Sequence, residues 1–224
     1  MRLSWILAGV LALGATPQIG VNALISQLES PDSQAVADAS KMLTERGLEV
    51  VPAVLKALHD NQSCQVQFLL TGVLRELQPD SAVPNATLLG IAQSKCKMKQ
   101  PGQEAMFRRR AAFFLAGRAD GVAAMAGLLQ GGDSATRRAA VLGFVDVLMG
   151  LSTGTPKIDM TPAWVDAMKP ALSALARSVR DSDDYVKCGA YDALIDAGKA
   201  PSDDLQQHAT HLLESVPKPK CPVK

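Results

Sequence analysis

Three consecutive arginines, Arg108 to Arg110, stand in the segment FRRRAAFFLAG, which runs from Phe107 to Gly117. Guanidinium groups clustered in this way bind phosphates and carboxylates, or stabilise negative charge in a catalytic site. The same residues also suit one helix of a larger scaffold. The segment therefore permits a basic binding patch, a catalytic arginine cluster or a structural helix, and its surroundings decide between them.

A helical wheel at 100° per residue separates the arginines from an apolar face. Four residues share that face and are predicted to be core: Phe107, Ala111, Phe114 and Leu115. Arg109 lies opposite them, and Phe113 lies off the buried stripe beside Arg109. Because exposed aromatic and arginine side chains are enriched at protein interfaces, Arg109 and Phe113 are candidates for a contact patch.

The arginine segment recurs along the chain, which indicates a repeat protein. TRRAAVLGFVDVL, at residues 136–148, places Arg137, Arg138 and Ala140 in the same columns as Arg108, Arg109 and Ala111. VKCGAYDALIDAG, at residues 186–198, places Lys187 in the first basic column, and weaker copies begin near residues 36 and 66. Arg138 joins Arg109 and Phe113 as a candidate contact residue, with a solvated helix face as the alternative.

Each repeat divides into two amphipathic helices by the spacing of its apolar residues. About eleven helices are predicted and no strand, with loops at residues 94–103 and 151–162, where Gly, Pro and polar residues gather. Thr161 followed by Pro162 is typical of a helix start, and the acids in DSDDY and PSDDL suit helix caps.

The pieces GGDSATRRAAVLGF, DSDDYVKCGAYDAL and SPDSQAVADASKML resemble the second helix of a HEAT or HEAT-like repeat. The resemblance implies an all-α, right-handed α-solenoid over residues 21–216, with about five antiparallel helix pairs plus a terminal helix. It also implies that the second helices line the binding surface. Arg108, Arg137 and Lys187 fall in the basic column that such repeats pair with acids of a neighbouring turn.

Four cysteines, Cys64, Cys96, Cys188 and Cys221, allow three pairings. In the solenoid, consecutive helices run antiparallel, so the start of one helix meets the end of the next. This topology selects Cys64–Cys96 and Cys188–Cys221, and the second bond would tie down the proline- and lysine-rich tail at residues 217–224.

The first twenty residues, MRLSWILAGVLALGATPQIG, have the layout of a secretory signal peptide, with cleavage expected between residues 15 and 23. Removing Arg2 with this leader leaves 22 basic and 22 acidic residues. A balanced charge argues against nucleic-acid binding, and no other apolar stretch approaches the length of a membrane span. The sequence predicts a periplasmic or secreted protein with no membrane insertion after cleavage.

Reactive constellations are hard to find elsewhere in the chain. His208, His211 and Glu214 are spaced three apart on a helix, but a solvated face explains them better than a metal site. No phosphate loop, nucleophile elbow or cofactor motif is present. We therefore expect a non-enzymatic scaffold without metal or cofactor that binds another protein. The alternatives are a HEAT-like lyase or chaperone of a tetrapyrrole pigment, on resemblance alone, and a structural component of an envelope assembly.

Overall fold

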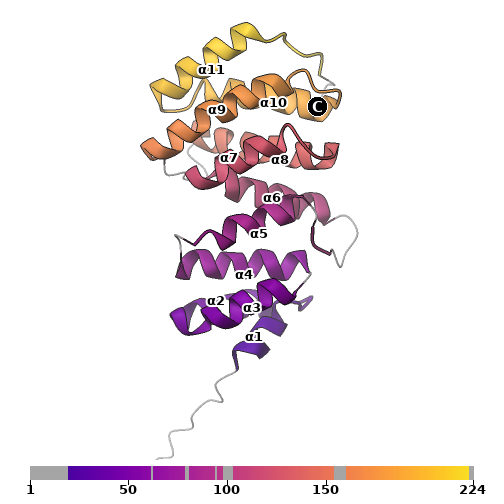
Figure 1. The fold of residues 1–224 in the computed structure, drawn as a ribbon, viewed down its shortest axis with the longest axis vertical. Helices are drawn as coiled ribbons and strands as arrows, with labels where there is room; N and C mark the ends of the chain where they lie inside the picture. The colour runs from indigo at the N-terminus through magenta and orange to yellow at the C-terminus, as the bar shows by residue number, and fades with distance from the viewer. Residues whose placement is uncertain are drawn as a thin grey trace, which may run out of the picture.

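The helices of this protein stack one above another into an elongated body (Figure 1). The structure is a computed structural model, and it describes residues 20–61, 63–78, 81–93, 95–97, 103–153 and 160–221. The predicted signal peptide lies outside the described residues except for Gly20, and at least half of each predicted loop also lies outside them. α1 is at one end of the stack and α11 at the other.

The described residues form eleven α-helices and one short 3-10 helix, and none of them forms a β-strand. The helices are α1 Val21–Gln27, α2 Ser33–Glu45, η1 Gly47–Val50, α3 Val51–Asp60, α4 Cys64–Leu77, α5 Val83–Ala92, α6 Glu104–Ala116, α7 Ala119–Leu128, α8 Ser134–Thr153, α9 Pro162–Ser178, α10 Asp184–Ala197 and α11 Asp203–Ser215. α8 continues through residues 151–153, which corrects the predicted start of the second loop.

The helices alternate between two layers. In one layer α6 packs on α8 and α8 on α10, and in the other α7 packs on α9 and α9 on α11. Successive helices of opposite layers also pack together, as α3 does with α4, α5 with α6 and α9 with α10. This arrangement confirms the predicted all-α solenoid of five helix pairs plus a terminal helix. We call the surface formed by α2, α4, α6, α8 and α10 the even-helix face.

Predicted capping residues set the starts of α9 and α10, whereas α11 has the predicted acids in its first turn but no side-chain hydrogen bond at its cap. The Thr161 hydroxyl accepts a hydrogen bond from the Trp164 amide at 3.2 Å, and Pro162 occupies the first turn of α9. The Asp183 carboxylate accepts from the amides of Tyr185 at 3.0 Å and Val186 at 3.3 Å. Such caps satisfy amide donors that the first turn of a helix leaves without partners.

Small residues allow the close stacking of α6, α8 and α10. A Cβ atom added at Gly143 of α8 would lie 2.7 Å from both the carbonyl carbon and the Cβ of Ala112. A Cβ at Gly189 of α10 would lie 2.4 Å from a methyl carbon of Val141. Glycine is therefore required at both positions by the approach of the neighbouring helix, although it lowers helix propensity.

The buried core is divided between α4 and α5. One cluster joins buried residues of α1 to α4, from Leu24 to Leu74, and the other joins buried residues from Leu88 to Ala209. α4 and α6 contact each other far less than α6 and α8 do. Aromatic side chains bridge this junction, with the Phe68 ring 5.8 Å from Phe107 and 5.6 Å from Phe114 between centroids.

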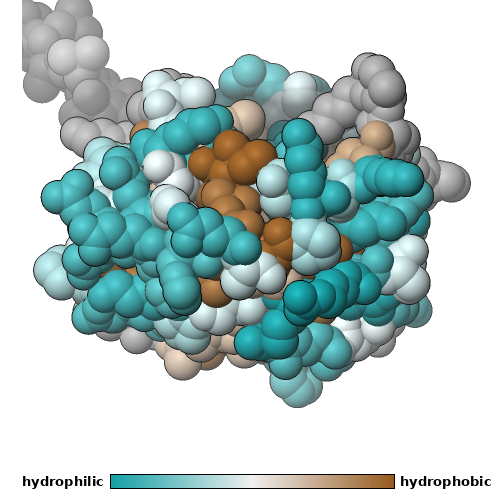
Figure 2. All heavy atoms as spheres, turned by 90° about the horizontal axis from the view of Figure 1, so that it is seen from above, coloured by the Kyte–Doolittle hydropathy of each residue, from teal (hydrophilic) through white to brown (hydrophobic). Residues whose placement is uncertain are grey.

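Both predicted disulfides are present. Cys64 pairs with Cys96 at a Cα–Cα distance of 5.0 Å, and Cys188 pairs with Cys221 at 5.8 Å. The first bond lies beside a backbone bridge in which the Cys64 amide donates to the Lys97 carbonyl at 3.0 Å. The second holds the end of the described tail against α10. Seen from the α11 end, the molecule is mostly hydrophilic, with a band of hydrophobic atoms near the centre (Figure 2).

Candidate functional site

Arg108 is a buried structural cation rather than an exposed binding group. It retains only 7% of its surface, and its guanidinium group donates to Glu104 of the same helix at 2.9 Å. It also donates to the Thr136 hydroxyl at 3.2 Å and lies 3.7 Å from the Asp133 carboxylate. These groups start the next even-numbered helix, so Arg108 ties α6 to the first turn of α8.

Arg109 also reaches the next repeat. Its Nε donates to Asp146 Oδ2 at 2.6 Å, and its second nitrogen donates to the other oxygen of the same carboxylate. This two-point pairing is the geometry in which arginine binds carboxylates most strongly. Arg109 stays about half exposed, but Asp146 of α8 already satisfies it.

The same pattern continues one repeat later. Arg137 donates to both oxygens of Asp181 at 2.8 and 3.2 Å, and Arg138 donates to Asp183 at 2.7 Å. The Arg138 guanidinium also lies 4.9 Å from the centre of the Tyr185 ring. Lys187 differs, because it pairs with Asp184 of its own helix at 2.6 Å. The arginines of α6 and α8 thus form ion pairs to the next even-numbered helix or to the turn before it.

Asp181 and Asp183 are held in their charged form. Burial acts to raise the pKa of Asp183, but hydrogen bonds from Arg138 and from backbone amides outweigh it, so its pKa lies below the usual 3.8. Burial likewise opposes ionisation of Asp181, and hydrogen bonds from Arg137 and the Asp183 amide lower its pKa below 3.8. Ion pairs of this kind fix the register of successive repeats.

The helical wheel predicted the exposure of Phe113 and Phe114 wrongly. Phe113 is half-buried and packs against the larger core, whereas Phe114, predicted as core, is 38% exposed. Phe114 points toward α4, which stands away from α6, and the Arg75 guanidinium lies 4.9 Å above its ring. A single-helix pattern cannot report the spacing of the neighbouring helices, and this spacing decides which of the two rings is covered.

Five of the eight exposed large apolar side chains in the described residues, which sequence reasoning missed, lie on three successive even-numbered helices. The other three are Leu48, Leu55 and Val83 on η1, α3 and α5. The five are Met106 and Phe114 on α6, Leu142 and Met149 on α8, and Tyr185 on α10. Arg109 and Arg138 lie among them. Leu142 and Met149 stand seven residues apart, two turns of α8, so a heptad spacing was the available signal. Large apolar patches on a soluble protein mark surfaces that contact other molecules.

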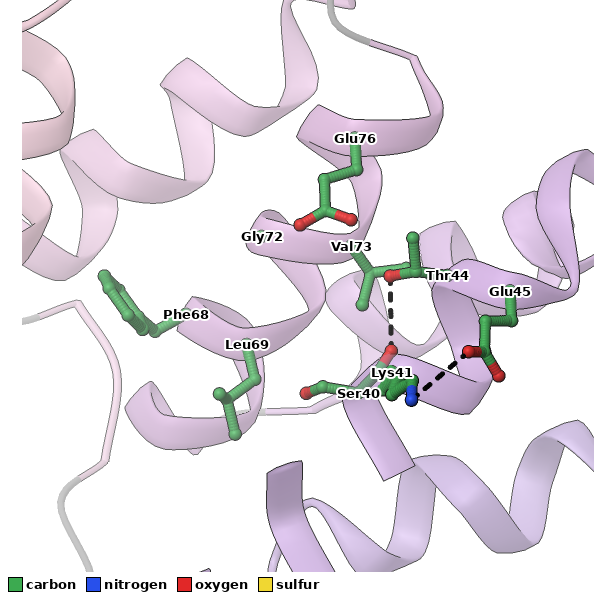
Figure 3. A pocket seen from close by; sticks show the side chains of 9 residues that line it. All are labelled: Ser40, Lys41, Thr44, Glu45, Phe68, Leu69, Gly72, Val73 and Glu76. Carbon is green, nitrogen blue, oxygen red and sulfur yellow. Dashed lines mark hydrogen bonds and ion pairs between the residues drawn. The ribbon is translucent and has the colours of Figure 1, made fainter. Parts of the chain in front are cut away.

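The even-helix face is hollowed between α2 and α4. Ser40, Lys41, Thr44 and Glu45 of α2 line this hollow of about 360 Å³ opposite α4, which contributes Phe68, Leu69, Gly72, Val73 and Glu76 (Figure 3). A second hollow of about 380 Å³ shares Phe68 and Leu69 and reaches Phe107 and Arg110 of α6. We call the two together the α4 groove. Sequence reasoning gave no sign of it.

The histidines do not form a reactive centre. His208 Nε2 lies 3.1 Å from the Lys169 carbonyl and 3.3 Å from the Ser173 hydroxyl, so it joins α11 to α9, while His211 is exposed. Within the described residues, no three histidine, cysteine or acidic side chains are grouped as metal ligands would be. Across the same part of the chain, no helix combines the length and hydrophobicity needed to cross a membrane.

Comparisons with known proteins give structural likeness only. No protein-family profile matches the chain. No curated protein matches its sequence. An engineered protein of known crystal structure is 18% identical, covers 87% of this chain and 95% of its own, and has a TM-score of 0.38. A designed armadillo repeat protein is 15% identical, covers 88% of this chain and all of its own, and has a TM-score of 0.31.

Proposed function

We propose that this protein is an exported, non-enzymatic HEAT-like scaffold that binds another protein through its even-helix face. One observation carries the proposal. The four paired arginines join repeat to repeat, while apolar side chains remain exposed on α6, α8 and α10. A solenoid of this kind offers a long, rigid surface and needs no reactive group to function.

Export is part of the proposal. Two disulfides persist in oxidising compartments such as the periplasm or the exterior of the cell, and they fit the signal-peptide layout of the first twenty residues. The balanced charge favours a protein partner over a nucleic acid. The partner therefore belongs to the same compartment, which directs the search to the cell envelope.

Capture from an envelope fraction tests this function. Purified wild-type protein is expected to retain a specific partner, and Leu142→Glu/Met149→Glu is expected to lose it, because two charges then stand on the contact surface. Leu48→Glu is the matched control, since Leu48 is also exposed but lies on η1, outside the even-helix face. Equal recovery by the double variant and by wild type would exclude this surface.

Arg109→Glu/Arg138→Glu is less suited to this test than the sequence alone suggests. Both guanidinium groups pair with acids of the next repeat, so the double reversal would place like charges beside Asp146 and Asp183. A loss of binding by that variant would not distinguish a changed binding surface from a changed packing of the repeats. Leu142 and Met149 make no such ion pairs.

A further inference from the structure

The α4 groove opens where the repeat pattern changes. The face of α8 toward α6 carries Ala139, Ala140 and Gly143, three small residues. The corresponding face of α10 carries Gly189, Ala190 and Ala193. α6 follows the same spacing, but it has Arg110 and Phe114 at the first and third positions. Bulky residues thus replace the small ones of the later repeats, and α6 contacts α4 less closely than α8 contacts α6.

The surface of α4 along the groove also lacks a bulky side chain at one position. Phe68, Leu69, Gly72 and Glu76 follow one another at helical spacing along the groove. By alignment of the repeats, Gly72 takes the place of Phe113 in α6 and Leu142 in α8. A Cβ atom at Gly72 would meet nothing within 4 Å, so no neighbouring helix requires glycine there. The missing side chain enlarges the groove.

Arg110 and Glu76, which carry opposite charges, stand at the two ends of the groove. Among the described residues, neither Arg110 nor Glu76 makes an ion pair, although the other arginines of the same helix do. The other charged residues lining the groove are engaged. Lys41 pairs with Glu45, and Glu29 accepts a hydrogen bond from Asn61 at 3.3 Å. Within the part of the chain that the structure describes, the groove therefore presents an unpaired cation near α6 and an unpaired anion near the end of α4.

The dimensions suit a short helix. From Gln65 to Glu76 the groove follows twelve residues of α4, or eleven rises of 1.5 Å, which is about 16 Å. α2 and α6 flank α4, so a bound helix would lie along α4 between them. Phe68 and Leu69 provide the apolar contact in this space.

We propose that the α4 groove binds an amphipathic helix of about three turns from the partner protein. The helix would place an apolar stripe on Phe68 and Leu69, acidic residues beside Arg110 and basic residues beside Glu76. This inference rests on the proposed scaffold function and adds the chemistry of the segment that is bound. It concerns α2, α4 and α6, whereas Leu142 and Met149 lie on α8.

Labelled peptides test the groove directly. The probe is a fourteen-residue helical peptide with two Glu in its first turn, two Lys in its last turn and three Leu along one face. Fluorescence anisotropy is expected to show saturable binding to the full wild-type chain. Arg110→Glu should weaken binding at least tenfold, and a second peptide with Lys at both ends should regain it on that variant.

Gly72 supplies a blocking variant and its control. Gly72→Gln fills the groove and should weaken probe binding at least tenfold, while Gly72→Ala adds one methyl group and should change it by less than threefold. Both variants should unfold at or above the wild-type temperature, because glycine is the poorer helix former. Probe binding by Gly72→Gln and Arg110→Glu at wild-type strength, or no binding by wild type, would overturn the proposal.

Two further results separate this inference from the scaffold function. If envelope capture is lost in Leu142→Glu/Met149→Glu but retained in Arg110→Glu and Gly72→Gln, the scaffold stands and the groove proposal fails. If wild type captures no partner at all, the scaffold function fails. Sedimentation that shows a wild-type dimer and a monomeric Gly72→Gln would assign the groove to a second copy of the chain and would also overturn the proposal.

Discussion

Gly143 and Gly72 make a matched pair that tests why the repeats stack closely in one half of the molecule. Both lie inside helices of the even-numbered layer, and alanine is the better helix former by about 1 kcal/mol. A Cβ at Gly143 meets the backbone of Ala112 at 2.7 Å, whereas a Cβ at Gly72 meets nothing within 4 Å. The same substitution is therefore expected to have opposite effects at the two sites.

The magnitudes follow from these contacts. Forcing a methyl group into a packed interface costs about 1–3 kcal/mol, and the Ala112 backbone can move only with the whole of α6. Because this contact is with backbone atoms, the cost lies at the upper end of that range, about 2–3 kcal/mol. After the gain in helix propensity of about 1 kcal/mol, Gly143→Ala should still lose about 1–2 kcal/mol, or roughly 2–8 °C in unfolding temperature. Gly72→Ala should gain up to about 1 kcal/mol. Urea and thermal unfolding followed by circular dichroism measure both, and a Gly143→Ala protein as stable as wild type would refute the close approach of α6 and α8.

Three other perturbations have expected outcomes. Replacing Cys188 and Cys221 by serine should lower the free energy of unfolding by about 3–4 kcal/mol, as expected for a closed loop of this length, and should expose the tail to proteases. Urea unfolding and limited proteolysis measure these two effects, and an unchanged urea midpoint would contradict the prediction. Asp183→Ala should lower the free energy of unfolding by about 1–3 kcal/mol at pH 7, because it removes both the cap of α10 and the partner of Arg138. The exposed Asp203 of α11 should tolerate alanine with a loss of less than about 0.5 kcal/mol. The lowered pKa values of Asp181 and Asp183 stabilise the folded protein above pH 3.8, and this stabilisation should be lost as the pH falls below 3.8. The difference in unfolding free energy between wild type and Asp183→Asn should therefore shrink in acid. A difference that stays constant from pH 7 to pH 3 would count against the ion pairs.

Features set by local or neighbouring geometry could be predicted from the sequence. Thr161 and Asp183 cap helices because capping depends on a few adjacent residues. The cysteine pairing followed from the antiparallel path of successive helices, which brings a helix start and the next helix end together. The repeat spacing also gave the layer in which Arg108 and Arg137 lie.

Features that depend on the distance between helices could not be predicted in this way. The helical wheel for α6 assumed that neighbouring helices cover both sides of its apolar stripe equally. It therefore predicted Phe114 as core and Phe113 as a contact residue, whereas Phe114 is the more exposed of the two. Arg109 lies opposite the buried stripe as expected, but its partner Asp146 is 37 residues away and carries no local signal. The clue to the α4 groove was present in Arg110, which stands where the next repeats have Ala139 and Gly189, and it required the repeats to be compared position by position.

Hydrogen exchange of the captured complex tests most directly whether the even-helix face is a protein-binding surface. Amide exchange measured by mass spectrometry with and without the partner should show slower exchange in α4, α6 and α8, and little change in α5, α7 and α9. Protection confined to the odd-numbered helices, or exchange that the partner leaves unchanged throughout the even-numbered helices, would contradict the account.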